Sequence, residues 1–279
     1  MTVREALLCA KEELKNVPDR DVDAAWIVSM ICGLRRGELH IQTEQELTQQ
    51  QQDVLAAVLA RRAKREPLQY IFGRVPFLNI ELKTDRRALI PRDETALLAE
   101  LAVSLIRQKG YRSLLDLGTG SGAIALACKY NIPSLSVCAS DISSDALALT
   151  EENARTLALS IELKKSDCFS ALNGQTFDCI LSNPPYIVQA ELEKLERELS
   201  FEPQNALDGG PDGLDFYRAI IAQAPGYLNT GGMLMFEIGL GQREAVEYLL
   251  LKAGFSDITV TKDYAGIERI IHCFKEETA

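Results

Sequence analysis

An Asn-Pro-Pro-Tyr segment at 183–186 follows an apolar stretch, 177–182, whose pattern predicts a β-strand. Proline fixes φ and lacks an N–H, so two consecutive prolines make a stiff, extended exit from that strand. The side-chain oxygen of Asn183, a rigid backbone carbonyl and the Tyr186 ring would then form a site for a planar NH2 group. The two oxygens would accept its hydrogens, and the ring would pack on its face.

An amide or aryl amine nitrogen is a poor nucleophile because its lone pair is delocalised into the neighbouring π system. Two acceptors on its hydrogens would localise electron density on the nitrogen and hold it towards an electrophilic carbon. Positioning of this kind contributes on the order of 7 kcal/mol in favourable cases. Taken alone, the segment is explained equally well as a strand-terminating turn with a packed tyrosine.

A second chemical signal is the glycine-rich loop 118–122, which lies between an apolar strand and a helix. Glycine lets the backbone turn sharply and approach a ligand closely. Asp141 follows the next strand, 19 positions after Gly122, which is where nucleotide-binding α/β folds place a carboxylate for ribose hydroxyls. The Gly-x-Gly-x-Gly spacing differs from that of dinucleotide binders and lacks the Gly-Lys-Ser/Thr of phosphate loops. It suits a nucleoside with a short charged tail, such as S-adenosylmethionine; a glycine turn capped by an aspartate is the alternative for the loop alone.

Charge and composition narrow the class of protein. The 279 residues include 30 Lys and Arg against 40 Asp and Glu, a net charge of −10. Residues 1–75 hold 11 of each sign, which leaves 19 basic and 29 acidic residues in 76–279. The net negative charge of 76–279 disfavours a nucleic-acid-binding protein that contacts phosphates, and it suits a small-molecule substrate or a basic protein partner.

The sequence predicts neither a metal site nor a membrane-spanning segment. Two histidines cannot form a multi-histidine metal site, and the seven cysteines, none in a Cys-x-x-Cys pair, are typical of reduced thiols in a cytoplasmic protein. No run approaches the ~18 apolar residues of a membrane span. We therefore expect a cytoplasmic protein without a metal or a membrane anchor, acting as a monomer.

The elements that must position these motifs fall into two domains, 1–75 and 76–279. Residues 1–66 predict three helices, the second ending at Gly33 and the third capped by Thr48, and the extended segments 70–73 and 77–82 predict a β-hairpin linker. Beyond the linker, strands alternate with helices, which predicts a parallel α/β sheet covered on both faces. The expected strands are 113–117, 135–140, 177–182 and 233–238, the helices 94–108, 122–130 and 144–157, and a closing hairpin 257–261 and 269–274.

Four weaker signals remain, and for the first three we prefer a structural explanation. Glu237 ends an apolar strand and is either a carboxylate of the site or, as we expect, a solvated strand-end acid. The acidic-basic stretch 191–198 is expected to be an exposed helix face. The basic cluster 61–65 is expected to be a solvated helix end. The loop 208–213 is either a substrate-facing flap or a plain surface loop.

The two motifs together resemble the amino-directed S-adenosylmethionine methyltransferases. Further segments are similar to the peptide chain release factor glutamine N5-methyltransferase family (the HemK/PrmC type). These segments are 67–73 (PLQYIFG), 89–95 (LIPRDET), 206–214 (ALDGGPDGL), 237–239 (EIG) and 263–269 (DYAGIER). The resemblance implies a Rossmann-like seven-stranded methyltransferase sheet joined to a small all-helical, substrate-recognition domain.

The resemblance also implies methyl transfer from S-adenosylmethionine to the glutamine of the Gly-Gly-Gln motif in class 1 release factors, leaving S-adenosylhomocysteine. Its implied catalytic and substrate-binding residues are Asn183, Pro184, Pro185 and Tyr186, with Arg92 on the substrate side. Its implied cofactor-binding residues are Gly118, Thr119, Gly120, Ser121, Gly122, Asp141, Ile142, Asp167, Cys168, Phe169, Asn183, Glu94 and Thr95.

The sequence departs from the family pattern at Ala96, where a second carboxylate is common, and at Cys168, where a tryptophan is common. The second departure predicts weaker stacking on adenine. Two other functions remain as alternatives: an N6-adenine nucleic-acid methyltransferase, because adenine presents a similar amino group, and a non-catalytic protein that binds S-adenosylmethionine.

Overall fold

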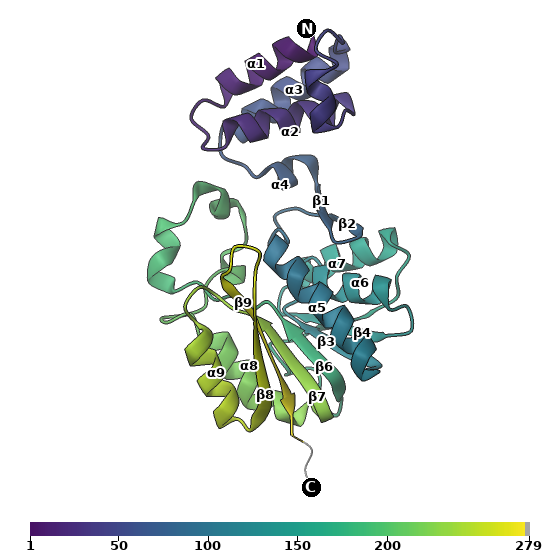
Figure 1. Ribbon diagram of the computed structural model, residues 1–279, viewed down its shortest axis with the longest axis vertical. Helices are drawn as coiled ribbons and strands as arrows, with labels where there is room; N and C mark the ends of the chain where they lie inside the picture. Colours follow the sequence, from purple (N-terminus) through teal and green to yellow (C-terminus); the bar gives the residue numbers. More distant parts are fainter. Residues whose placement is uncertain (277–279) are drawn as a thin grey trace. The chain divides into compact units, whose positions relative to one another are not determined.

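The computed structural model describes residues 1–276 (Figure 1). The chain groups into two compact units. The helical unit consists of Met1–Gly73 together with Glu196–Phe201, and the sheet unit begins at Arg74 and includes the rest of the chain. The boundary expected from the sequence lies two residues beyond Gly73.

The helical unit is built from α1 (Val3–Glu13), α2 (Arg20–Cys32), η1 (Arg36–His40), α3 (Gln49–Arg62) and α4 (Leu68–Phe72). Gly33 ends α2 with φ +67°, and the Thr48 hydroxyl accepts a hydrogen bond from the Gln51 amide, so both predicted helix boundaries are confirmed. The prediction that 70–73 is extended is wrong. These residues belong to α4 and its Gly73 cap because Ile71 and Phe72 pack against the core of the helical unit.

The basic cluster 61–65 is only in part the solvated helix end that was expected: Arg61 and Lys64 are exposed, but Arg62 is buried. Arg62 is 6% exposed, and its guanidinium pairs with Asp23 at 2.6 Å and with Glu198 at 2.9 Å. Arg65 pairs with the same Glu198 carboxylate at 2.6 Å. The expectation of one exposed helix over 191–198 is also wrong: the stretch forms two short turns, η2 (Gln189–Lys194) and η3 (Arg197–Phe201). A buried guanidinium is unfavourable without a carboxylate partner, which accounts for the position of Glu198.

The sheet unit confirms the predicted α/β fold. Its seven strands are β3 (Ser113–Leu117), β4 (Ser136–Asp141), β5 (Glu162–Lys165), β6 (Phe177–Ser182), β7 (Leu228–Glu237), β8 (Phe255–Lys262) and β9 (Glu268–Lys275). They lie in the order β5-β4-β3-β6-β7-β9-β8, with β9 antiparallel to both of its neighbours and the other pairs parallel. A β-hairpin does form, from β1 (Arg74–Phe77) and β2 (Ile80–Lys83), but its turn at Leu78 and Asn79 lies within the segment 77–82 that was expected to be one strand.

Apolar residues on both faces of the sheet account for the helices that cover it. Alternate residues of one strand point to opposite faces: Leu115 belongs to the core formed with α8 and α9, and its neighbour Leu114 to the core formed with α5 and α6. The helices are α5 (Asp93–Lys109), α6 (Ala123–Asn131), α7 (Ser144–Thr156), α8 (Asp215–Gln223) and α9 (Arg243–Lys252), with short η4 (Gln204–Ala206) and η5 (Ala224–Gly226). Within residues 1–276, none of the helices has the length and apolar character to cross a bilayer.

The strand order determines where a ligand can bind. The chain runs outward from β3 to β4 and β5, and then returns to β6 on the other side of β3. At such a reversal the loops after two adjacent parallel strands separate and leave a crevice at their carboxyl ends. The glycine loop follows β3 and the Asn-Pro-Pro-Tyr turn follows β6, so the fold brings both motifs to this crevice (Figure 1).

Candidate active site

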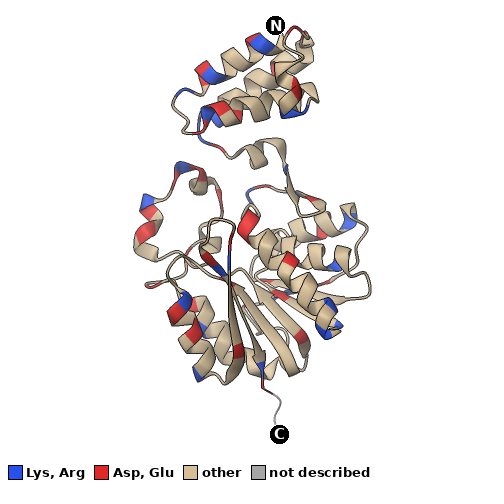
Figure 2. Cartoon of the chain, in the orientation of Figure 1, with Lys and Arg blue, Asp and Glu red and all other residues tan. Residues whose placement is uncertain are grey.

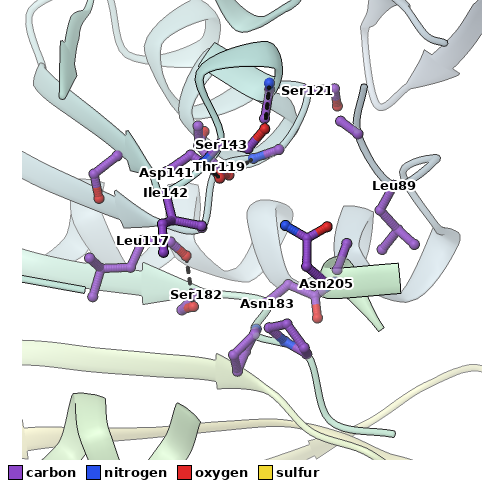
Figure 3. Close-up of a pocket in the computed structure, with 18 of the residues that line it drawn as sticks. Leu89, Leu117, Thr119, Ser121, Asp141, Ile142, Ser143, Ser182, Asn183 and Asn205 are labelled. Atoms are coloured by element: carbon purple, nitrogen blue, oxygen red, sulfur yellow. Dashed lines mark hydrogen bonds between the residues drawn. The ribbon is translucent and has the colours of Figure 1, made fainter. Parts of the chain in front are cut away.

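A cavity of about 360 Å³ lies at the carboxyl ends of β3, β4 and β6 in the sheet unit. Its size is within the range of small-molecule sites. Figure 3 shows labelled side chains of both motifs around it. The predicted residues that line it are Thr95, Gly118, Thr119, Gly120, Ser121, Asp141, Ile142, Asp167, Cys168, Asn183, Pro184 and Pro185.

The glycine loop is held open by backbone conformation and by the residues beneath it. Gly118, Gly120 and Gly122 have φ of +71°, +58° and +84°, a region that residues with a Cβ rarely adopt. A Cβ on Gly122 would lie 2.7 Å from the Thr150 methyl group. The Thr150 hydroxyl donates to the Gly120 carbonyl at 2.9 Å. At Gly118 and Gly120 the backbone therefore forms a fixed wall of the cavity, because neither residue has a side chain that would fill it.

Two carboxyl groups support this loop. Asp141 accepts hydrogen bonds from the amides of Gly120 at 2.9 Å and Ser143 at 2.8 Å, and burial raises its pKa. A carboxylate has about four acceptor sites, so Asp141 can still accept from a ligand hydroxyl beside these amides. Asp116 is fully buried and accepts from the Thr119 hydroxyl at 2.6 Å and from the Ala125 amide at 3.1 Å. Burial raises the pKa of Asp116 to about 7.

The Asn-Pro-Pro-Tyr turn is tied to two buried side chains. Asn183 Nδ2 donates to the Thr95 hydroxyl at 3.0 Å, and that hydroxyl donates to Glu237 Oε2 at 2.6 Å. The Tyr186 hydroxyl donates to Glu237 Oε1 at 3.3 Å. The expectation that Glu237 is solvated is wrong, because the residue is 2% exposed. It is tolerated there because two hydroxyl groups satisfy its carboxylate.

The loop 208–213 packs against the same turn, so it is not a plain surface loop. Gly209 is buried, and a Cβ there would lie 2.7 Å from the Cα of Tyr186. Gln242 Nε2 joins the two segments, donating to the carbonyls of Tyr186 at 2.9 Å and Gly213 at 3.1 Å. The close approach requires glycine at 209 and holds the exit of the turn in place.

Comparisons with known proteins agree with this geometry. The model of the PrmC N-terminal domain matches residues 5–73, and that of the methyltransferase small domain matches residues 93–211. A release factor glutamine methyltransferase of Geobacter sulfurreducens is 40% identical over 97% of this chain and 95% of its own length. Another, of Moorella thermoacetica, is 37% identical over 99% of this chain and 100% of its own length.

The chain belongs to the release factor glutamine methyltransferase family. Its fold is also that of more distant methyltransferases. The crystal structure of a methyltransferase from Pyrococcus furiosus matches with a TM-score of 0.55, at 17% identity, over 78% of this chain and 98% of that one. The family prediction made from the motifs is confirmed.

Five of the residues predicted for this family member do not line the cavity: Gly122, Phe169, Tyr186, Glu94 and Arg92. Phe169 is fully buried and stacks on Tyr227 with ring centroids 4.4 Å apart. Arg92 forms an ion pair with Glu202, whose other oxygen accepts a hydrogen bond from the Ile90 amide at 2.9 Å. Tyr186 is connected to the cavity only indirectly: its hydroxyl bonds to Glu237, which also accepts a hydrogen bond from the cavity residue Thr95.

The cavity also contains residues that the motifs did not indicate. They come from the segment before α5, from η4 and its neighbours, and from α8, and they include Leu89, Pro91, Pro203, Asn205, Phe216 and Ile220. Asn205 is exposed and adds a second amide near the Asn183 turn in Figure 3. The family-like segments 89–95 and 206–214 were the available signals, because each lies within or beside these linings. Among the described residues, no cluster of three or more His, Cys, Asp or Glu side chains is arranged to hold a metal ion.

Proposed function

We propose that this protein transfers a methyl group from S-adenosylmethionine to the side-chain amide N5 of the glutamine in the Gly-Gly-Gln motif of a class 1 release factor, and so tunes translation termination. The observation that carries the proposal is that the glycine loop and the Asn183 turn open onto one cavity. A donor and an amide held by these two elements would meet there. Family membership supports the choice of a glutamine amide as the acceptor.

The residues of the cavity suit S-adenosylmethionine. The open glycine loop accommodates the methionine part and the ribose, Asp141 has free lone pairs for the ribose hydroxyls, and Asp167 with Cys168 would flank the adenine. Cys168 offers less stacking surface than an aromatic residue would. When bound, S-adenosylmethionine supplies an electrophilic methyl group on its sulfonium.

The Asn183 turn provides the other half of the chemistry. The hydrogen bond to Thr95 uses the Asn183 NH2 group, so Asn183 Oδ1 is free to accept one hydrogen of the substrate amide. The Pro184 carbonyl accepts the other hydrogen. With both hydrogens held, electron density shifts onto the nitrogen and its position relative to the donor is fixed. No strong base is needed, because the nitrogen releases a proton after it has gained the methyl group.

The release factor is the proposed partner of this enzyme. We also propose that the reaction takes place in the cytoplasm, that the enzyme acts as a monomer and that it requires no nucleic acid. Acidic and basic residues are interspersed along the helices of each unit (Figure 2). We assign recognition of the protein substrate to the helical domain, 1–75. This domain exposes the apolar side chains Leu8 (63%) and Ile41 (77%).

The test is incubation of the enzyme with methyl-labelled S-adenosylmethionine and a purified class 1 release factor, followed by mass spectrometry of the peptide that carries Gly-Gly-Gln. The expected product carries one added methyl group on that glutamine. A release factor with the glutamine replaced by alanine is the matched control and should take no label. Label on adenine in a parallel DNA or RNA sample, with none on the release factor, would contradict the proposal.

A further inference from the structure

A chain of hydrogen bonds leads from the turn into the protein interior. It begins at Asn183 beside the cavity, passes through Thr95 in the first turn of α5, and ends at Glu237, the last residue of β7. Thr95 is 5% exposed and Glu237 is 2% exposed. The proposed chemistry uses Asn183 and its hydrogen bond to Thr95, and it leaves Glu237 without a role.

The chemical identity of Glu237 gives this chain a direction. An ionised carboxylate accepts hydrogen bonds and donates none. When Glu237 is ionised, the hydroxyl hydrogen of Thr95 must therefore point at it, 2.6 Å away. Its oxygen is left to accept, which selects the NH2 end of the Asn183 side chain as the neighbour, at 3.0 Å. The Oδ1 end of the same amide is then directed away from Thr95.

We propose that Glu237 is a positioning residue that acts through Thr95 to keep the oxygen end of the Asn183 amide facing the substrate. The inference rests on the proposed function, because that function needs an acceptor at this place. If the group at 237 donates a hydrogen bond to Thr95, the threonine hydroxyl is free to donate to Asn183 Oδ1. The Asn183 amide would then turn its NH2 group to the substrate NH2 group, and the two sets of donors would repel each other.

The surroundings of Glu237 make this orientation sensitive to pH. Burial raises the pKa of Glu237 to about 7, and the hydrogen bond from Thr95 opposes that shift. The charge of Glu94 on α5 raises this pKa further, whereas the Tyr186 hydrogen bond and the charge of Arg269 on β9 lower it. The hydroxyl of Tyr217 on α8 donates to the Glu237 backbone carbonyl at 2.9 Å. Protonation of Glu237 below about pH 7 should therefore weaken the selection of the Asn183 orientation.

The kinetic test compares three variants with the wild-type enzyme, at saturating S-adenosylmethionine and release factor. Glu237→Gln keeps the shape and adds a donor, and we expect kcat at pH 8 to fall about 10²-fold, the scale of a misplaced reacting group. Thr95→Val removes the hydroxyl, and its kcat should fall by a similar factor. Thr95→Ser keeps a hydroxyl and should recover most of the lost kcat. Affinity for S-adenosylhomocysteine should change less than about threefold in Glu237→Gln, because its cofactor loop is intact.

A matched control is Asp178→Asn, at the other end of β6. Its carboxylate accepts from the Arg112 amide at 2.7 Å and from Asn229 at 2.7 Å, so the variant makes the same acid-to-amide change away from the cavity. Its kcat should stay at the wild-type value. Wild-type kcat should decline below about pH 7, and Glu237→Gln should lack that decline. Wild-type kcat in Glu237→Gln, or the same acid decline in both enzymes, would overturn the proposal.

A second measurement does not depend on turnover. The side-chain NH2 signals of Asn183, assigned by their loss in Asn183→Asp, are followed by nitrogen-15 NMR between pH 5 and 9. They should titrate with a midpoint near pH 7 in the wild type and stay constant in Glu237→Gln. A wild-type enzyme that shows this titration but labels no release factor would refute the proposed function alone. Labelling by the wild type with an Asn183 signal that does not respond would refute the role of Glu237 alone.

Discussion

The glycine loop and the Asn-Pro-Pro-Tyr turn form the same cavity but are held in place differently. The loop is supported from nearby in the chain: Asp116 lies 3 residues from its partner Thr119, and Asp141 lies 21 residues from Gly120. The turn is supported from far away. Thr95 is 88 residues from Asn183, and Gln242 is 56 residues from Tyr186.

This difference corresponds to what each element must do. The loop presents backbone groups, whose geometry follows from glycine conformation and strand order. The turn must present one particular side-chain oxygen, whose orientation is set by the donors and acceptors around it. We therefore expect changes in the loop to act on cofactor affinity and changes in the turn to act on turnover.

The largest effect is expected for Asn183→Ala. Removing the acceptor oxygen should lower kcat about 10³-fold, the scale for losing one positioned polar group in an active site. The dissociation constant of S-adenosylhomocysteine, measured by calorimetry, should change less than about threefold. Asp178→Asn, which changes a side chain of the preceding strand β6 away from the cavity, serves as the control. Unaltered turnover in Asn183→Ala would contradict the role of Asn183, and a wild-type protein without turnover would favour a protein that binds the cofactor without catalysis.

The buried Asp116 should make the stability of the sheet unit depend on pH. Its folded pKa is raised to about 7 from 3.8, so the stability it contributes is present below pH 3.8 and is lost as pH rises to 7. Between pH 5 and pH 8 this loss is about 3 kcal/mol, at 1.4 kcal/mol per unit over two units. Asp116→Asn should lack it. Urea unfolding of both proteins at the two pH values measures the difference, and parallel changes would contradict it.

Asp141→Ala is expected to do the opposite of Asn183→Ala: it should weaken cofactor binding and leave kcat at saturating cofactor nearly unchanged. Two backbone amides and the ribose hydroxyls would lose their acceptor, which corresponds to about 10²-fold weaker cofactor binding at about 1.5 kcal/mol per charged hydrogen bond. At saturating cofactor, kcat should recover to within about fivefold of the wild type. A fall in kcat that saturation does not correct would show that loop and turn are not separate in function.

The sequence was sufficient for the elements whose causes are local. The glycine loop, Asp141, the Asn183 turn and the order of strands and helices follow from residue types and spacing over fewer than about 30 positions. Glu237 was misjudged because its partner Thr95 is 142 residues away. Arg62 was misjudged for the same reason, with Glu198 136 residues away. In both cases a charged residue was expected in solvent, and a distant partner allows it to be buried.

For the edge strand β5 and the helix α4, the local sequence does not determine the secondary structure. The sequence of β5, Glu-Leu-Lys-Lys, has little apolar character, and the strand forms because β4 provides a hydrogen-bonding edge. The apolar residues of α4 fit a strand equally well, and contact with the helical core decides their conformation. Local pattern alone does not distinguish these outcomes.

The smallest effect tests the long-range support of the turn. Gly209→Ala adds one methyl group against the Tyr186 backbone, where a Cβ would lie 2.7 Å from Cα, so the turn must shift by a few tenths of an ångström. We expect kcat to fall about 10-fold, which is less than the 10²-fold associated with a full 1 Å misplacement. Affinity for S-adenosylhomocysteine should stay at the wild-type value. Gly226→Ala is the control, because a Cβ there meets no atom within 4 Å. Equal losses in the two variants would indicate general destabilisation and would contradict a specific role for Gly209 in holding Tyr186.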